Sequence, residues 1–400
     1  MKQRLQNLAI AFVSTMISLV ILEIALQIVA PPPRVGIATL NAPAAEIYGW
    51  ALFTNDETSV KNPDTGQPIA YTTNSRGWKD VEHQLEKPEG VVRIVFVGDS
   101  NTFAITPLED GFTRQVELLL YERGYTQVEV ISIGVGAWGT DQVLEALRNE
   151  GVLYDADFII HQFSDNDIVN NIWPMEGLRS DSIYWQKLFR YEIDYPDLNL
   201  QRIELTPPAE PWNIVFKRNL LKIAIFYYAD LLMQEFTTQP EVAVEIDLST
   251  PYDPTDPYYR YTSEELTPQA QYAWALTEAM FLQMRGASEE SGAQFLIYSP
   301  NGDEGIRQWS LDWGRIASDE QGDFVMWGGE RFAVDFWHVN RQLEDISTRN
   351  DIPLILPARA YQRYEYDHHA DSAGNVNMAR DVVDYLLGWP PFVEAISDGQ

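Results

Sequence analysis

The chain has 400 residues, of which 45% are hydrophobic, a proportion typical of a folded protein that excludes disorder throughout. Its 28 basic and 59 acidic side chains give a formal net charge of −31, so we expect neither nucleic acid nor an anionic lipid surface to bind through a basic patch. The absence of cysteine excludes disulfides, thiolate metal sites, thiol nucleophiles and a cysteine-linked lipid anchor. No HExxH-type spacing occurs among the five histidines, so the sequence predicts no transition-metal site.

An apolar segment near the N-terminus is long enough to cross a membrane. Residues 8–30 contain one charged side chain, Glu23, and as a helix they would span about 34 Å. Lys2 and Arg4 precede the segment, which predicts a cytoplasmic N-terminus and an extracytoplasmic main domain. A cleaved signal peptide is the alternative, although its apolar core would be shorter and a cut after the segment would fall at a proline. Glu23 is either tolerated at the membrane edge or contacts a partner helix.

Composition divides the chain into three regions. Residues 1–33 are predicted to be a membrane anchor that ends in three prolines, and residues 34–87 an irregular N-terminal extension. Residues 88–393 form the main domain, which carries an insertion over residues 170–265. Within this insertion, residues 237–263 contain four prolines and four tyrosines. Such a segment is either a lid or wall beside an active site, or a solvated excursion.

From residue 91 onward, short apolar runs alternate with helical patterns. The sequence predicts strands over residues 91–97, 128–133, 158–163, 294–298 and 353–356. It predicts helices over residues 108–123, 140–149, 214–235, 267–290, 330–349 and 372–387. This alternation favours an α/β fold in which helices cover both faces of a mainly parallel sheet.

Polar motifs follow the ends of the predicted strands, where open α/β sheets bind their ligands. Gly98-Asp99-Ser100 follows the first strand, a glycine-rich turn over residues 134–139 the second, and Ser164-Asp165-Asn166-Asp167 the third. Asp367-His368-His369 precedes the last helix. Each motif alone is common in loops, but together they supply a hydroxyl, backbone N–H groups, an amide, an imidazole and a carboxylate. This is the set that acyl transfer requires.

These motifs resemble those of the SGNH or GDSL hydrolase superfamily over roughly residues 70–390. The first block reads RIVFVGDSNTF, with Ser100 at the nucleophile position, and the third reads SDND, with Asn166 at the position of the amide donor. The second block reads SIGVGAWGTDQ, in which Ala137 replaces the usual glycine and Gly136 precedes it. Because a backbone N–H serves whatever the side chain, the resemblance implies an oxyanion hole formed by Ser100, Gly136 or Ala137, and Asn166.

The last block assigns the base. Alignment on Gly374 makes His369 the base and Asp367 the carboxylate that orients it, with His368 as the weaker alternative. Residues 74–80, NSRGWKD, are similar to a segment that precedes the first strand in membrane-anchored bacterial members of the superfamily. The resemblance implies a flavodoxin-like three-layer α/β/α sandwich with about five parallel strands, preceded by one transmembrane helix.

The activity implied by this resemblance is that of an extracytoplasmic serine esterase with a Ser-His-Asp triad, an acyl-enzyme intermediate and no metal or organic cofactor. Its substrate would be an acylated carbohydrate or lipid. An O-acyltransferase of a cell-surface polysaccharide and a non-catalytic carbohydrate-binding relative are the alternatives, and the intact Ser100, Asn166 and His369 argue against the latter. Trp138 and Trp173 flank the motifs and would either stack on sugar or belong to the core.

Overall fold

The computed structural model describes residues 2–29, 44–172, 187–205, 268–312, 316–327 and 330–398, together with isolated positions between these ranges. The chain forms two compact units. The first comprises residues 1–34, 178–184 and 208–245, and the second comprises residues 35–177, 185–207 and 246–400. Most of the predicted helix over residues 214–235, the whole loop over residues 237–263 and Trp173 lie outside the described residues.

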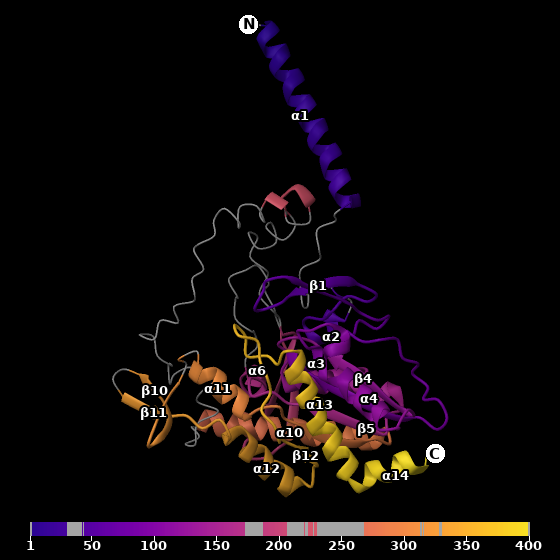
Figure 1. Cartoon of the computed structure of the whole chain (residues 1–400), viewed down its shortest axis with the longest axis vertical. Helices are drawn as coiled ribbons and strands as arrows, with labels where there is room; N and C mark the ends of the chain where they lie inside the picture. The colour runs from indigo at the N-terminus through magenta and orange to yellow at the C-terminus, as the bar shows by residue number, and fades with distance from the viewer. Residues whose placement is uncertain are drawn as a thin grey trace. The chain divides into compact units, whose positions relative to one another are not determined.

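The first unit contains α1 (Lys2–Val29), the long N-terminal helix in Figure 1. Its Ile10–Val29 part is long and apolar enough to cross a membrane, and none of this part is buried. A signal sequence has the same properties. Glu23 of α1 accepts hydrogen bonds from the backbone N–H groups of Ala224 and Ile225, each at 2.9 Å, so its carboxylate has partners within the same unit.

The second unit is built on a parallel sheet of five strands in the order β12-β8-β5-β3-β4. Its strands are β3 (Val92–Gly98), β4 (Val128–Gly134), β5 (Phe158–Gln162), β8 (Gln294–Tyr298) and β12 (Leu354–Ile355). Every residue of β3 and β5 is buried, because helices cover both faces of the sheet. The chain passes from β3 to β4 on one side and then to β5 on the other, so the strand order reverses at β3.

Helices cover the sheet on both faces, which confirms the predicted three-layer α/β class (Figure 1). One core joins Ile94, Phe96 and Ile160 of the sheet to α4 (Phe112–Glu122), α13 (Ser372–Gly388) and α14 (Pro390–Asp398). The other core joins the alternate sheet residues, among them Val95 and Val97, to α5 (Thr140–Asn149), α10 (Pro268–Glu290) and α12 (His338–Asn350). The alternation follows from the period of two in a strand.

Two predicted helices differ in the structure. The helix expected over residues 108–123 is divided into η1 (Leu108–Asp110) and α4, because Gly111 between them has an extended backbone. The prediction of a single helix over residues 330–349 is wrong over its first part. There, β11 (Glu330–Ala333) pairs with β10 (Gly322–Trp327), which also pairs with β9 (Ala317–Asp319). The hydrogen bonds of this antiparallel sheet come from a partner strand that the helical pattern does not reveal.

The N-terminal extension contains α2 (Ala45–Tyr48) and an antiparallel hairpin of β1 (Glu57–Lys61) and β2 (Pro68–Thr72), where the sequence analysis expected irregular structure. It also contributes core residues. Trp50 and Trp78 are buried with Trp138, and the Trp78 and Trp138 rings meet edge to face at 6.1 Å. Trp138 therefore belongs to the core. A second hairpin, β6 (Phe189–Ile193) and β7 (Leu200–Glu204), lies within the predicted insertion.

Candidate active site

Ser100 lies directly beyond the carboxyl end of β3, at the point where the strand order reverses. Gly98 ends the strand, and α3 (Ser100–Phe103) begins after Asp99, whose carboxylate accepts the N–H of Asn101 at 2.9 Å. A Cβ atom on Gly98 would lie 2.2 Å from Thr102 Oγ1, so this sharp strand-to-helix turn requires glycine. The turn presents Ser100 at the first position of the helix.

His369 lies in the loop before α13 and contacts both Ser100 and Asp367. Its Nε2 is 2.9 Å from Ser100 Oγ, and its Nδ1 is 2.5 Å from Asp367 Oδ1. The same carboxylate accepts the backbone N–H of His369 at 2.8 Å. Because the carboxylate can only accept from Nδ1–H, Nε2 is left as the acceptor for the serine hydroxyl.

The surroundings of Asp367 favour the ionised form of its carboxyl. Burial alone would raise the pKa of this carboxyl, but the hydrogen bond from His369 and the nearby histidine charges lower the pKa below its usual value. Asp367 is therefore an anion across the neutral range. An anion at this position stabilises an imidazolium on His369.

His368 occupies a different position. Its side chain is exposed, and its ring stacks on the His369 ring with centroids 4.4 Å apart and planes 30° apart. Its Nδ1 is 3.8 Å from Asp367 Oδ1, too far for a hydrogen bond. The structure thus brings His369 within hydrogen-bond distance of both Ser100 and Asp367, whereas His368 Nδ1 lies 3.8 Å from Asp367 Oδ1.

The residues predicted to form the oxyanion hole follow β3, β4 and β5. Ala137 has a φ of 65°, a left-handed conformation that favours glycine. Asn166 is half-buried just beyond β5. Among the described residues, the N–H groups of Ser100, Gly136 and Ala137 and the side-chain amide of Asn166 donate to no other group.

A buried polar network that the sequence does not predict holds α3 against β5. Gln162 Oε1 accepts from the N–H of Thr102 at 3.1 Å and from its hydroxyl at 2.9 Å. Ser164 Oγ accepts from Gln162 Nε2 at 2.8 Å and from Asn101 Nδ2 at 2.9 Å. The only signal in the sequence is a glutamine at the end of a strand in which His161 is the one other polar residue.

The NSRGWKD segment provides a second support. Lys79, 4% exposed, donates from Nζ to the carbonyls of Phe103, Ala104 and Thr106 at 3.2, 2.6 and 2.6 Å, at the end of α3. Burial lowers the pKa of Lys79 to about 7. Asp80, next in sequence, accepts the N–H of Ser132 on β4 at 2.7 Å.

Several buried ionisable groups lie behind the Ser100 turn. Burial raises the pKa of Asp99, and it raises that of Asp167 well above its usual value, with a further contribution from the charge of Asp99. Burial lowers the pKa of His161 to about 4, so this side chain is neutral. Asp141 instead forms an ion pair with Lys187 at 2.6 Å. Of these groups only Asp99 lies close to Ser100 Oγ, with its Oδ2 at 3.4 Å as a second, longer acceptor for the hydroxyl than His369 Nε2.

In the described part of the chain, one group of side chains has the composition of a metal site. Asp367, His368 and His369 offer ligand atoms that all lie within 4.8 Å of one another. Both ring nitrogens of His369 already take part in hydrogen bonds, with Asp367 and Ser100. A cation bound by this ring would compete with one of those hydrogen bonds, so these residues fit hydrogen bonding to Ser100 better than metal binding.

No protein-family model matches the chain, and no curated protein sequence matches it. Solved structures with similarity to it include the acetyl xylan esterase AlAXEase, at 12% identity and a TM-score of 0.34, covering 74% of this chain and 99% of that one. A lipase/acylhydrolase from Enterococcus faecalis has 12% identity and a TM-score of 0.36, with coverage of 74% and 96%. An aryl esterase from M. smegmatis has the same identity and TM-score, with coverage of 74% and 99%. Such low values do not identify an activity for this chain.

Proposed function

We propose that the chain is a serine esterase of the SGNH type. The observation that carries the proposal is the hydrogen-bonded series Ser100–His369–Asp367. A 2.9 Å contact joins Ser100 to His369 across 269 positions in sequence, and a 2.5 Å contact joins His369 to Asp367 within one loop. A hydroxyl, an imidazole and a carboxylate in this order form the arrangement that activates a serine for attack on a carbonyl. The position of Ser100 at a carboxyl strand end supports the same activity, as does its backbone N–H, which has no partner within the described ranges.

In the proposed reaction, Ser100 Oγ attacks the ester carbonyl while His369 Nε2 takes the hydroxyl proton. The N–H groups of Ser100 and of Gly136 or Ala137, with the Asn166 amide, stabilise the developing oxyanion. His369 then donates its proton to the departing alcohol, which leaves an acyl group on Ser100. Water, deprotonated by His369, attacks this acyl-enzyme and releases the acid. Asp367 holds the ring orientation and stabilises the imidazolium in both halves of the reaction.

The test is covalent labelling of the full chain by a fluorophosphonate, together with turnover of p-nitrophenyl acetate. We expect Ser100→Ala and His369→Ala each to abolish labelling and turnover, whereas His368→Ala keeps substantial activity. Because nucleophile and base act as a unit, the double variant of Ser100 and His369 is expected to be scarcely worse than either single variant. A dead His368→Ala variant, or equal labelling of His369→Ala and wild type, would contradict the proposed triad.

The proposed location is extracytoplasmic, with the second unit anchored to the membrane by α1. The apolar Ile10–Val29 segment and the preceding Lys2 and Arg4 support this topology. The substrate would then be an ester on or near the cell surface. We expect the protein to stay with the membrane fraction after washing at high salt and alkaline pH. Recovery of a soluble form that lacks residues 1–30 would instead indicate a cleaved signal peptide.

A further inference from the structure

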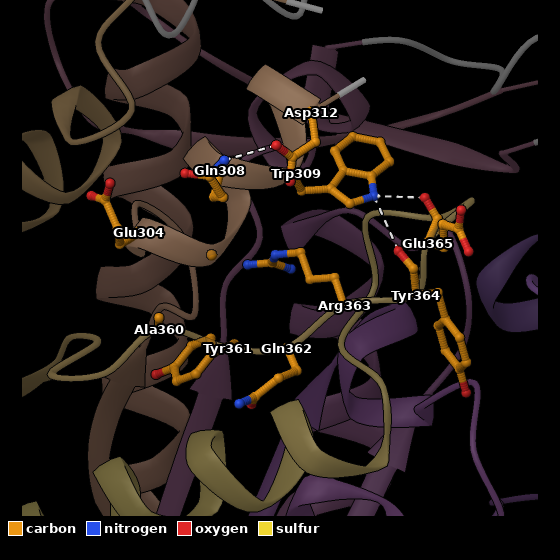
Figure 2. A pocket seen from close by; sticks show the side chains of 11 residues that line it. Glu304, Gln308, Trp309, Asp312, Ala360, Tyr361, Gln362, Arg363, Tyr364 and Glu365 are labelled. Carbon is orange, nitrogen blue, oxygen red and sulfur yellow. Dashed lines mark hydrogen bonds between the residues drawn. The ribbon is translucent and has the colours of Figure 1, made fainter. Parts of the chain in front are cut away.

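A pocket of about 830 Å³ lies beside the candidate active site, between α11 (Glu304–Asp312) and the segment over residues 360–365 (Figure 2). Its volume falls in the range of about 300–1,000 Å³ that is usual for ligand pockets. Trp309 forms one wall, and its indole N–H donates to the carbonyls of Tyr364 and Glu365 at 3.0 and 3.1 Å, which fixes the ring.

The pocket lining is rich in groups that bind hydroxyls. Exposed amides and carboxylates surround its opening, namely Glu304, Gln308, Asp312, Gln362 and Glu365. Figure 2 shows the Arg363 guanidinium between the side chains of Gln308 and Gln362. The Arg363 side chain is 10% exposed, and its Nε–H has no partner among the described residues. A fatty acyl chain would remove water from these groups without replacing their hydrogen bonds, which is unfavourable.

The charge of the pocket lining indicates which charge a polar ligand should carry. Arg363 is the one cation that lines the pocket in the described part of the chain, and it is already paired with the buried Asp303. Three carboxylates, those of Glu304, Asp312 and Glu365, also line it. Glu304 pairs with Arg307 at 2.7 Å, so the excess of negative charge comes from Asp312 and Glu365. The excess of negative charge disfavours a carboxylate- or phosphate-bearing ligand and favours a neutral or positively charged one.

The pocket is connected to the base of the proposed triad. The Trp309 ring is 6.3 Å from the His368 ring, which in turn stacks on His369 at 4.4 Å. Arg363 pairs with Ala370 as an antiparallel bridge, and the Tyr364 N–H donates to the His369 carbonyl at 3.2 Å. The Trp309 wall of the pocket is therefore separated from the His369 ring by the His368 ring.

We propose that this pocket is a binding subsite for the sugar part of the ester substrate, and that it selects neutral or amino saccharides over acidic ones. The inference deepens the proposed esterase function by naming the substrate class: an acylated neutral or amino oligosaccharide, whose acyl group reaches Ser100 while a neighbouring sugar occupies the pocket. Polyhydroxylated rings suit such a site because amides and carboxylates bind hydroxyls and an aromatic wall packs against the ring.

The test is direct binding to the full chain in detergent, with Ser100→Ala as background so that no probe is hydrolysed. The probes are xylotetraose, chitotetraose, its deacetylated amine form and tetragalacturonate, measured by calorimetry. The Gln308→Leu/Gln362→Leu double variant removes two hydrogen-bonding amides and should weaken neutral saccharide binding about thirtyfold. Gln321→Leu alters an exposed glutamine outside the pocket lining and serves as the matched control.

Binding of a neutral or amino saccharide that the double variant weakens and Gln321→Leu does not would support the proposal. Absence of saccharide binding at millimolar concentration, binding unaffected by the double variant, or equally tight binding of tetragalacturonate would overturn it. These outcomes are independent of catalysis because the Ser100→Ala background does not react. A wild-type chain that fails to turn over p-nitrophenyl acetate would contradict the esterase function and not the subsite.

Discussion

Replacement of Lys79 by methionine tests whether the NSRGWKD segment stabilises the strand-to-helix turn that carries Ser100. The Lys79 ammonium is the donor for three backbone carbonyls at the end of α3, those of Phe103, Ala104 and Thr106. It also lies 4.7 Å from the centre of the Phe103 ring. Methionine keeps much of the apolar length of the side chain but has no donor. The variant therefore removes the hydrogen bonds and retains most of the packing.

The expected loss follows from the carbonyls that are left without a donor. Each buried acceptor that loses its partner costs about 1–3 kcal/mol. Burial lowers the pKa of Lys79 to about 7, which shows that the charge itself is unfavourable at this position, and a neutral side chain avoids that cost. We therefore expect Lys79→Met to lower the free energy of unfolding by about 3 kcal/mol, nearer the lower end of the range for three acceptors.

The assay is denaturant unfolding of the full chain in detergent at pH 6, where Lys79 is protonated, together with p-nitrophenyl acetate kinetics. We expect kcat to fall about tenfold with little change in KM, since a displaced α3 shifts Ser100 by a fraction of an ångström. Lys87→Met is the control, because Lys87 pairs with Asp157 at 2.7 Å in a partly exposed position. Such an ion pair contributes about 1 kcal/mol or less to the free energy of unfolding. Equal effects of the two substitutions would refute the assigned role.

Three further predictions concern Asn166, Ala137 and the pH dependence that Lys79 confers. Asn166→Ala should fold normally and lose about 10²–10³ in kcat, as expected for one oxyanion donor, and unchanged turnover would reduce Asn166 to a turn residue. Ala137→Gly should raise the unfolding free energy by up to about 1 kcal/mol without loss of kcat, whereas Ala137→Val should lower it, because residue 137 has a positive φ. Between pH 7 and 10.5 the free energy of unfolding of the wild type should rise relative to that of Lys79→Met, because the unfolded chain binds the Lys79 proton more tightly than the folded chain does. Parallel pH profiles of the two proteins would contradict this sign.

The central strands and their helices were predictable because local pattern and packing agree. The predicted bounds of β8 and α5 match the structure to the residue. In β8 the apolar run Phe295–Tyr298 comes three positions after Gly292, and Thr140–Asn149 begins just after a glycine. Such segments carry their own start and stop signals. The candidate site was also visible, because each motif directly follows a strand or precedes a helix.

The remaining features depend on partners that are distant in sequence. β11 forms only because β10 supplies its hydrogen bonds, while its residues also fit the helical pattern. The role of Lys79 requires the carbonyls of α3, which lie 24 to 27 positions further along the chain. The role of Gln162 likewise depends on its hydrogen bond with Thr102, which lies 60 positions earlier in the chain. Backbone groups used as partners leave no trace in composition or periodicity, so these contacts appear only in three dimensions.

The sheet topology explains why the proposed catalytic groups gather at one place. With β3 between β4 and β5, the loops that follow these three strands diverge and leave room for a ligand, as expected where the strand order reverses. Ser100, Ala137 and Asn166 each stand just beyond one of these strands. The parallel sheet therefore fixes the proposed nucleophile and the proposed oxyanion donors through rigid core elements. The proposed base and the pocket at Trp309 belong instead to loops and α11, where substitutions would alter substrate choice with little effect on the position of Ser100.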